Sequence, residues 1–390
     1  MELNPTVLVF SPVASHPPHR GNRQRILQMA SLFRDCGFRI DLAIGRNRTI
    51  TPEARAFWSD IHVLKHVPRW RPTRRTVPFD AWYTPGLGEE LAEIVKKSGA
   101  DIVLFNYIFH TKALEFLPKS IFSILDTHDV FAGRASLHKS RKYSGGFFSC
   151  SPEDEKKYLN RANAVVAISA DDARTFSERG VSRPIFNLPF SKRTVSQRET
   201  NAPTNNTSQG AKRTLTFGMM LSANDLNLAS LYEFISSVDK HYGQSPPFQV
   251  VIAGDIRNLA YRYFPHRGKR FKRDWVSYLG EVESLDAFYS SVDAAIIPIT
   301  EGTGMAVKFV EGLAQRVPVI STSAGSRGSN ATHPLHLLPS VQSLAVEIGT
   351  LEDDKLRELM AVGTELSLEL EARVLSELGN LLRHATGSPL

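Results

Sequence analysis

Short apolar runs alternate along the chain with stretches of helical periodicity. The first run, TVLVF at 6–10, is typical of a buried strand. Helical spacing of apolar residues follows over 22–36 and stops at Gly37, which predicts a helix with a glycine end. Repeated alternation of this kind predicts parallel sheets with helices on both faces. The strands predicted are 6–10, 38–44, 101–105, 123–125, 164–168, 215–219, 248–253, 276–279, 294–298 and 318–321.

A polar segment at 191–213 interrupts this alternation. It reads SKRTVSQRETNAPTNNTSQGAKR, and such a composition is typical of a linker. We therefore predict two doubly wound domains, at 1–190 and 214–365, joined by this linker. Residues 366–390 form a last segment in which leucine and valine recur every four residues. It predicts an amphipathic helix whose apolar stripe packs on a core, across the two domains.

Composition narrows the class of protein without naming a function. Of 390 residues, 42% are hydrophobic and 22% charged, which is typical of a folded globular chain. Two cysteines are too few for a disulfide scaffold or a cysteine-based metal site, and they favour a reducing compartment. The apolar run near the N-terminus is short and follows an acidic residue, so we expect no signal peptide. No apolar run in the sequence is long enough to span a membrane. We therefore expect a cytoplasmic protein.

Standard nucleotide-binding motifs are missing where they would be diagnostic. The dinucleotide motif G-x-G-x-x-G should follow the first strand, but residues 11–20 contain no glycine. A P-loop is also absent, because Gly268-Lys269 is followed by Arg270. No G-x-S-x-G elbow occurs either. These absences argue against a dinucleotide-dependent dehydrogenase, a P-loop protein and an α/β-hydrolase.

Gly21 and Asn22 stand where the first helix begins, shortly after the first strand. Free N–H groups and the helix dipole at such an end favour a phosphate, and Arg23 and Arg25 follow within the first turns. A glycine turn with solvated arginines explains the same residues equally well. Both interpretations stay open on this segment alone.

The most informative stretch follows the strand predicted at 294–298. A loop containing Gly302 and Gly304 leads into a helix on which Lys308 and Glu311, three residues apart, share one face. A surface ion pair would give the same spacing. However, the order strand, glycine loop, helix places backbone amides, a cation and an acid where a sheet binds ligands. We therefore predict that Lys308 binds a diphosphate and Glu311 a ribose.

Several segments together resemble the retaining GT-B glycosyltransferases of family four. The pattern Gly302-x-Gly304-x-x-x-Lys308-x-x-Glu311, followed by PVIST and Gly325, is similar to the donor site of that family. LDTHD at 125–129 resembles its inter-domain histidine segment, and EKKYLNRANAVVAIS at 155–169 resembles the end of its first domain. The resemblance covers most of the chain.

The resemblance implies a fold, an activity and site residues. The fold would be α/β, with two Rossmann-like domains that face each other across a cleft, the first binding the acceptor and the second the nucleotide sugar. The enzyme would transfer a sugar with retention of configuration, with His128 against the transferred sugar. The residues implied for catalysis are His128, Lys308 and Glu311. Those implied for donor binding are Gly21, Asn22, Gly302, Thr303, Gly304, Lys308 and Glu311, and those expected to face the cleft are Asp129, Arg134 and Gly325.

The sequence departs from the family pattern at two places. The usual glutamate pair, E-x7-E, would put its first acid at Thr303, and Glu301 lies two residues too early to replace it. This chain therefore resembles the variant branch with G-x-G-x-x-x-K-x-x-E, in which another basic residue often stands at the position of Ala306. The loop GMMLSAND at 218–225 also lacks the arginine and lysine that commonly contact the diphosphate.

No cofactor is expected, and the partners follow from the resemblance. Asp126 and Asp129 beside His128 could suggest a metal, but no Asp-x-Asp occurs in the chain and metal-free transfer fits better. We expect a nucleotide-diphosphate sugar as donor and a glycan or lipid-linked acceptor. The family implies bacterial polysaccharide biosynthesis.

Two other functions stay open on the sequence. A sugar-nucleotide epimerase could use the same two-domain fold, since a fold does not determine an activity. A non-catalytic binding protein is a second alternative, because Thr303 and Ala306 depart from the pattern. Nucleic-acid binding would suit the basic isoelectric point, but no motif supports it, and we expect no nucleic-acid partner.

The net charge of +7 is concentrated in three windows. They lie at 65–75, which also contains Trp70, at 134–142 and at 266–273, and each lacks acidic residues. Solvated loops would explain them equally well. Because two windows fall in the predicted acceptor domain, we expect a peripheral contact with an anionic membrane or a lipid diphosphate.

Overall fold

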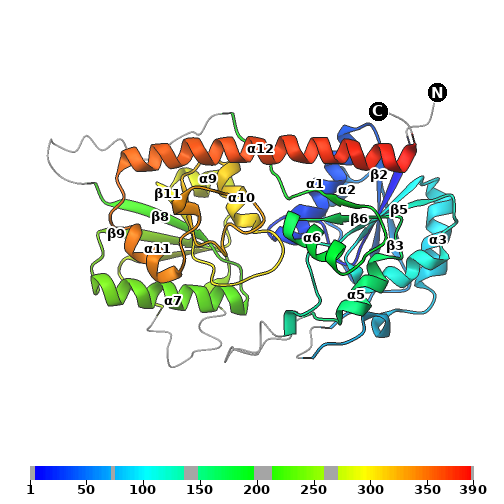
Figure 1. Ribbon diagram of the computed structural model, residues 1–390, viewed down its shortest axis with the longest axis horizontal. Coiled ribbons are helices and arrows are strands. Elements are labelled where there is room, and N and C mark those ends of the chain that lie inside the picture. The colour runs from blue at the N-terminus through cyan, green and yellow to red at the C-terminus, as the bar shows by residue number, and fades with distance from the viewer. Residues whose placement is uncertain (1–4, 72–74, 136–147, 197–212, 259–270, 388–390) are drawn as a thin grey trace. The chain divides into compact units, whose positions relative to one another are not determined.

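The computed structural model describes residues 5–71, 75–135, 148–196, 213–258 and 271–387. The chain divides into two compact units. The first unit contains Met1–Phe190 and Arg373–Leu390, and the second contains Ser191–Ala372. Each unit is built on one parallel sheet with helices on both faces (Figure 1). The predicted fold class, two doubly wound α/β domains, is confirmed.

The first unit contains a seven-stranded parallel sheet in the order β3-β2-β1-β4-β5-β6-β7. Because every pair is parallel, all carboxyl ends lie at one edge. The strand order reverses between β1 and β4, where connections diverge to opposite faces. The strands are β1 (Thr6–Ser11), β2 (Arg39–Gly45), β3 (Asp60–Leu64), β4 (Ile102–Asn106), β5 (Phe122–Asp126), β6 (Ala164–Ala167) and β7 (Ile185–Asn187).

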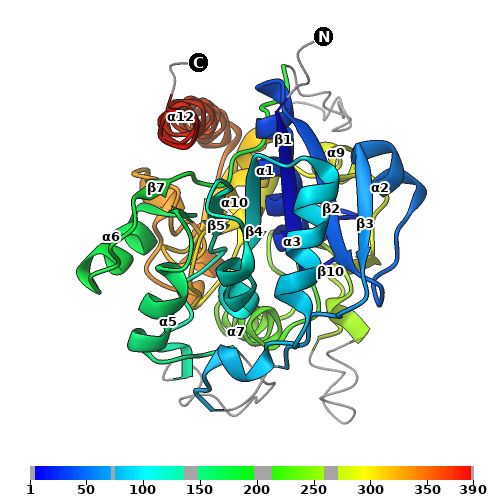
Figure 2. The same ribbon diagram turned by 90° about the vertical axis from the view of Figure 1, so that its right-hand side faces the viewer.

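Helices cover both faces of this sheet, as Figure 2 shows. β1 explains why: Val7 and Val9 join one hydrophobic cluster, whereas Leu8 and Phe10 join the other. The first cluster includes α1, and the second includes α3. The helices of the unit are α1 (Gly21–Asp35), α2 (Pro52–Phe57), η1 (Phe79–Trp82), α3 (Leu87–Ser98), η2 (Ile108–Phe116), α5 (Pro152–Leu159) and α6 (Ala170–Glu178).

The second unit contains a five-stranded parallel sheet in the order β10-β9-β8-β11-β12, which reverses between β8 and β11. Its strands are β8 (Leu215–Met220), β9 (Phe248–Ala253), β10 (Val276–Gly280), β11 (Ala294–Ile297) and β12 (Val319–Ser321). Its helices are α7 (Asp225–Tyr242), α9 (Leu285–Ser290), α10 (Val307–Ala314), η4 (Pro334–His336), α11 (Val341–Glu347) and the first part of α12 (Asp353–Thr386).

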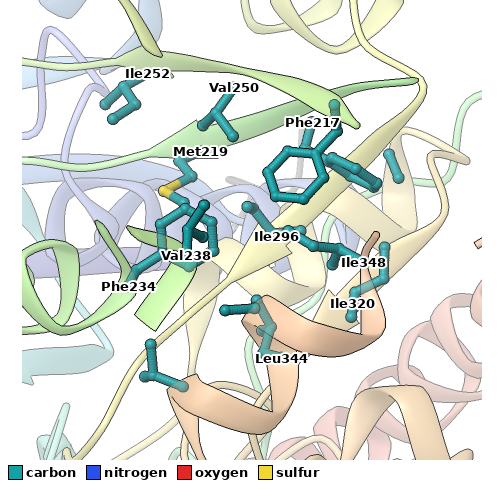
Figure 3. Close-up of a cluster of buried hydrophobic side chains, with 14 of the residues drawn as sticks. Phe217, Met219, Phe234, Val238, Val250, Ile252, Ile296, Ile320, Leu344 and Ile348 are labelled. Atoms are coloured by element: carbon teal, nitrogen blue, oxygen red, sulfur yellow. The ribbon is translucent and has the colours of Figure 1, made fainter. Parts of the chain in front are cut away.

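The core of the second unit lies between its sheet and the helices α7 and α11. Phe217 and Met219 of β8 point toward Phe234 of α7 and Leu344 of α11, as Figure 3 shows. All four are fully buried. On the other face, Gly218 lets Phe288 of α9 approach the strand, since a Cβ there would lie 3.1 Å from the ring. This packing fixes β8 and β11, whose ends carry the candidate site.

The C-terminal helix starts much earlier than residue 366, where we predicted it. α12 begins at Asp353, because the helical pattern already runs through 353–365. This segment contains no proline, and its single glycine, Gly363, lies within the helix. The predicted apolar stripe is buried, as expected for core packing. Leu378, Leu381 and Leu382 belong to a core cluster of the first unit, so this one helix contributes to both units.

The predicted linker begins inside the second unit. Val195 N–H donates to the Ala314 carbonyl at 2.9 Å, and Thr194 N–H donates to Glu371 at 2.8 Å. The rest of the predicted linker, 197–212, lies outside the described residues. Among the helices that the structure describes, none has the length and apolar character needed to cross a bilayer.

Candidate functional site

The carboxyl edge of the first sheet brings together three residues predicted from the sequence. Gly21 and Asn22 are the first two residues of α1, which follows β1. His128 lies just after β5. Asp129 follows His128 and forms an ion pair of 2.7 Å with Arg134. Asp129 and Arg134 are the residues of this unit that we expected to face the cleft.

Tyr107, which the sequence analysis missed, connects these residues. Burial raises the pKa of its phenol, and the interaction of the hydroxyl with the Asn22 side chain opposes that shift. Its ring stacks on His128, with centroids 4.0 Å apart and planes 9° from parallel. The signal in the sequence was weak: an aromatic residue directly after a buried strand, in a run rich in aromatics.

Hydrogen bonds determine the tautomer of His128. The Asn106 amide donates to the Phe10 carbonyl at 3.0 Å, which leaves Asn106 Oδ1 facing His128 Nε2 at 2.8 Å. Nε2 must therefore carry the proton and donate it, and Nδ1 is the acceptor. Burial lowers the pKa of this imidazole to about 4, even though Asp126 opposes the shift. His128 is thus neutral at physiological pH.

Two backbone conformations at this edge are strained. Tyr107 has φ of 68° and His128 has φ of 61°, in the left-handed region that side chains with a Cβ rarely adopt. Strain of this kind costs about 1–3 kcal/mol per residue and persists where the surroundings impose it, often at functional sites. Both residues follow the ends of strands, and their rings stack on each other in these backbone conformations.

Arg25 is a structural residue, and not the phosphate ligand that one of our two interpretations allowed. Its side chain is 1% exposed and forms a two-pronged ion pair with Asp126, with Nε 3.0 Å from Oδ2 and Nη2 3.1 Å from Oδ1. Arg25 Nη1 also donates to the Pro189 carbonyl at 3.1 Å. Arg23 donates to the carbonyls of His16 and Pro17 in the loop after β1. Arg25 is therefore buried within the fold, whereas Arg23 stays partly exposed.

A buried acidic side chain supports the loop that follows His128. Glu155 is fully buried and accepts hydrogen bonds from the backbone N–H groups of Phe131 and Ala132, and it pairs with Arg179.

Asp172, at the start of α6, is 6% exposed, and its Oδ2 has no hydrogen-bond partner among the described residues. Burial, together with the charge of Asp129, raises the pKa of Asp172 to about 7.

Replacing Asp172 with asparagine should therefore stabilise the first unit. The folded pKa of this acid is above its unfolded value, so its ionisation costs stability as pH rises from about 4 to 7, and the whole cost remains above pH 7. We expect Asp172→Asn to raise the free energy of unfolding by up to about 4 kcal/mol at pH 8, less the smaller loss of a helix N-terminal charge. Urea unfolding at pH 4.5 and pH 8 measures the gain.

The neighbouring Asp171 provides a matched control for this variant. It lies on the same first turn but is exposed and paired with Arg174 at 2.6 Å. Asp171→Asn should change stability little at either pH. An Asp172→Asn protein that is no more stable at pH 8 than at pH 4.5, relative to the parent, would contradict the buried charge.

In the second unit, the loop between β11 and α10 holds the predicted glycines. Gly304 has φ of 64°, which favours glycine, and a Cβ on Gly302 would collide with the guanidinium of Arg327. Arg327 Nε donates to the Thr303 carbonyl at 3.1 Å, and Nη1 donates to the Ala324 carbonyl at 2.7 Å. Arg327, which we did not predict, thus fixes this loop against the segment after β12.

Lys308 lies in the first turn of α10, just after this loop. Its Nζ is buried and has no hydrogen-bond partner among the described residues. Burial lowers the pKa of Lys308 to about 8, although the charges of Glu311 and Asp255 raise it. A buried ammonium normally has several hydrogen-bond partners, and Lys308 departs from this rule among the described residues.

Glu311 lies one turn further along α10 and is 5% exposed. Burial raises the pKa of Tyr289, at the end of α9, and the charge of Glu311 adds to this rise. Asp255, after β9, accepts a hydrogen bond from Ala223 N–H in the loop after β8. Lys308, Glu311 and Asp255 therefore form one group of opposite charges at the carboxyl edge of the second sheet.

The remaining predicted residue of this unit is Gly325, which follows β12. Its N–H donates to the Thr322 carbonyl at 2.9 Å, so it shapes a turn beside the β11–α10 loop. Ala306 is the residue before α10, and its N–H donates to the Arg327 carbonyl at 3.2 Å. At this position, where the variant branch often has a basic residue, the Ala306 backbone connects the loop to Arg327.

The aromatic residue of the first basic window is turned inward. Trp70 is partly buried, packs on Phe109 with centroids 6.3 Å apart, and carries Arg48 over its ring at 4.8 Å. Its ring is therefore only partly exposed to solvent. Much of the second and third windows, 136–142 and 266–270, lies outside the described residues, as does 72–74.

The predicted site residues thus fall into two groups. Gly21, Asn22, His128, Asp129 and Arg134 belong to the first unit. Gly302, Thr303, Gly304, Lys308, Glu311 and Gly325 belong to the second. Each group gathers at the carboxyl edge of its own sheet, where doubly wound folds bind ligands.

Comparison with known proteins agrees with this division. Residues 211–354, all within the second unit, match the family model described as glycosyl transferases group 1. No curated protein sequence matches the chain at a significant level. The match lies over the segment that contains Lys308 and Glu311.

Solved structures show the same fold over nearly the whole chain. Sucrose-phosphate synthase from Thermosynechococcus elongatus is 15% identical, with a TM-score of 0.72 over 98% of this chain and 100% of that one. HepE from Anabaena, in complex with UDP and glucose, is 14% identical, with a TM-score of 0.64 over 99% and 100%. The pneumococcal O-GlcNAc transferase GtfA, in complex with UDP and GlcNAc, is 8% identical, with a TM-score of 0.66 over 99% and 100%. The fold is therefore GT-B, and together with the family match it supports a GT-B glycosyltransferase.

Proposed function

We propose that the chain is a retaining glycosyltransferase that moves a sugar from a nucleotide-diphosphate sugar to a glycan, a lipid-linked glycan or another acceptor. The family match over the second unit and the GT-B fold support glycosyl transfer. One observation supports the donor class most directly: the buried ammonium of Lys308 has no hydrogen-bond partner among the described residues. A diphosphate would supply the missing acceptors and the opposite charge.

The donor site would use three kinds of group from one loop and one helix. Backbone N–H groups of the loop at Gly302–Gly304 and the start of α10 favour the diphosphate. Lys308 would neutralise the charge that develops on the leaving diphosphate as the sugar–phosphate bond breaks. Glu311 would accept hydrogen bonds from the ribose hydroxyls. No metal is needed for these roles, and we propose that transfer is metal-independent.

The first unit would hold the sugar being transferred. His128 is neutral, its Nε2 is occupied by Asn106, and Nδ1 remains an acceptor for a sugar hydroxyl. Stacking on Tyr107 and the hydrogen bond with Asn106 hold the imidazole in this orientation. Binding of this kind orients the anomeric carbon rather than moving a proton.

Calorimetric titration with UDP, GDP and dTDP tests the donor site and the base together. Two neighbours of this fold were solved with UDP, so we expect UDP to bind most tightly. Transfer or hydrolysis of the matching sugar nucleotides then separates the functions. Binding without turnover would indicate a non-catalytic protein, interconversion of the donor sugar an epimerase, and failure of all three nucleotides to bind would refute the proposed site.

The affinity for UDP should decrease as pH rises above 8. The Lys308 pKa is about 8 without ligand, and a bound diphosphate would raise it by adding opposite charge. Binding is then strongest below pH 8, where the ammonium is already protonated, and it weakens by up to about tenfold per pH unit above it. Calorimetry at pH 7 and pH 9, in buffers of different ionisation enthalpy, measures both the affinity and the expected proton uptake.

Substituting His128 should separate transfer from donor binding. Asparagine tolerates the positive φ of this position, so His128→Asn keeps the backbone while removing the imidazole. We expect the transfer rate to fall about 10- to 100-fold, the effect of one or two lost hydrogen bonds. UDP affinity should stay within about twofold. A variant that loses UDP binding as well would contradict the proposed division of roles.

Peripheral contact with anionic lipid remains part of the proposal on the acceptor side. The basic residues at 65–75 would provide it without Trp70, whose ring is packed inward. Liposome co-sedimentation that responds to neither anionic lipid nor salt would remove this idea.

A further inference from the structure

Three side chains of the first unit meet on one face of its sheet, away from the carboxyl edge. Asp41 lies on β2, and Asp60 and His62 lie on the edge strand β3. Asp41 pairs with Asp60 in the parallel register, and His62 follows two residues later on the same face. Figure 2 shows the two strands side by side at one end of the sheet. Their potential ligand atoms all lie within 4.8 Å of one another.

Two of these side chains are buried and incompletely satisfied. The side chain of Asp41 is fully buried and that of His62 is 8% exposed. Asp41 Oδ2 and His62 Nε2 face each other at 3.5 Å, and neither has a hydrogen-bond partner among the described residues. Buried polar atoms are normally paired, so an orphaned carboxylate oxygen beside an orphaned imidazole nitrogen indicates a shared ligand.

Asp60 supplies a third donor at the mouth of this group. Its Oδ2 lies 3.7 Å from His62 Nε2, and its side chain is 52% exposed, which gives a path to solvent. A tetrahedral ion with ligand distances of about 2.0–2.2 Å places its ligand atoms roughly 3.3–3.6 Å apart. The two distances from His62 are close to this spacing, and the exposed Asp60 can move to complete it.

We propose that Asp41, Asp60 and His62 bind a divalent transition-metal cation of the Zn²⁺ class. An imidazole nitrogen favours such ions over Mg²⁺ or Ca²⁺, which take mostly oxygen ligands in larger numbers. Three protein ligands leave a fourth position for water. Arg39 donates to Asp41 Oδ1 at 3.0 Å, while Asp41 Oδ2 faces His62. The oxygen that would bind the cation is therefore the one that Arg39 does not contact.

The cation would join the edge strand to the sheet and take no part in transfer. The three residues lie near the start of β2 and β3, whereas His128 lies beyond the end of β5. In a parallel sheet these are opposite edges. The proposal is therefore independent of the glycosyltransferase function.

Titration of chelator-treated full-length protein with Zn²⁺ tests it. We expect one Zn²⁺ per chain by calorimetry, and a rise in Tm of about 5–10 °C at a concentration near 100 times the Kd. Co²⁺ should give visible absorption bands typical of nitrogen and oxygen ligands. Because Asp60 is exposed, Asp60→Asn should fold normally and weaken Zn²⁺ binding at least about tenfold.

Two further variants complete the test. His62→Gln should abolish binding, and His241→Gln, which removes an exposed imidazole in the second unit, should leave it unchanged. Absence of heat and of a Tm shift with excess Zn²⁺ would overturn the proposal and indicate a simple histidine–carboxylate contact. Unchanged stoichiometric binding in Asp60→Asn and in a folded His62→Gln would also overturn it.

Discussion

Replacing Lys308 with methionine should make the protein more stable and nearly inactive. Methionine keeps the length of the chain but removes the buried ammonium, whose Nζ has no hydrogen-bond partner among the described residues. Loss of a group that stabilises a leaving anion typically costs about 100- to 1,000-fold in kcat. We expect a loss of that size with any accepted sugar nucleotide, measured in steady-state assays, and a comparable weakening of UDP binding.

The gain in stability has a defined pH window. The folded pKa of Lys308, about 8, is below its ordinary value of 10.5, so burying the charged form costs up to about 3 kcal/mol below pH 8. That cost disappears as pH rises from 8 to 10.5, because the folded state then releases its proton first. The Lys308→Met protein should therefore exceed the parent in Tm at pH 7, and the two values should converge near pH 10.

Lys240 provides the control for this pair of effects. It is an exposed lysine on α7 of the same unit. Lys240→Met should change neither kcat nor Tm appreciably. If Lys308→Met kept full activity, the proposed donor site would be wrong, whatever its stability.

Removing Arg25 should cause the largest loss of stability in the first unit. Asp126 would remain fully buried without its two-pronged partner, and breaking a buried pair in this way costs about 3–5 kcal/mol. We expect Arg25→Met to lower the Tm of this unit by roughly 6–20 °C. Calorimetric scanning of the full chain measures it.

A double-mutant cycle shows whether the loss comes from the uncompensated charge. Arg25→Met combined with Asp126→Asn removes both charges, so the double variant should recover much of the stability that the single variant loses. Arg34→Met removes an exposed arginine from the same helix and should have little effect. A double variant that is as unstable as the sum of both single variants would argue against the buried pair.

Much of the fold could be predicted because its strands are apolar over several residues. TVLVF at 6–10 and FQVVIA at 248–253 lie in the structure within one residue of the prediction. The edge strand DIHVL at 60–64 was missed because Asp60 and His62 interrupt its apolar pattern. Asp60 and His62 are also the residues that lie beside Asp41 in the structure. The polar side chains that made this strand hard to predict are therefore those of the proposed cation site.

The candidate site was predictable only where motif and chemistry coincide in the sequence. Lys308 and Glu311 lie on one helix, three residues apart, and could be predicted as a pair. Tyr107 and Arg327 could not, because their roles arise from contacts with residues distant in the chain, His128 and Thr303. Arg25 is indistinguishable in sequence from a solvated arginine, and only its burial against Asp126 shows its role.

The shared helix α12 affects the order in which the protein can fold. Leu378, Leu381 and Leu382 are part of a core of the first unit, yet the ribosome adds them after the entire second unit. Domains that are continuous in sequence can fold as they emerge. Here the core of the N-terminal unit stays incomplete until α12 has been synthesised. A truncation at the C-terminal end would therefore appear first as a folding defect of the N-terminal half.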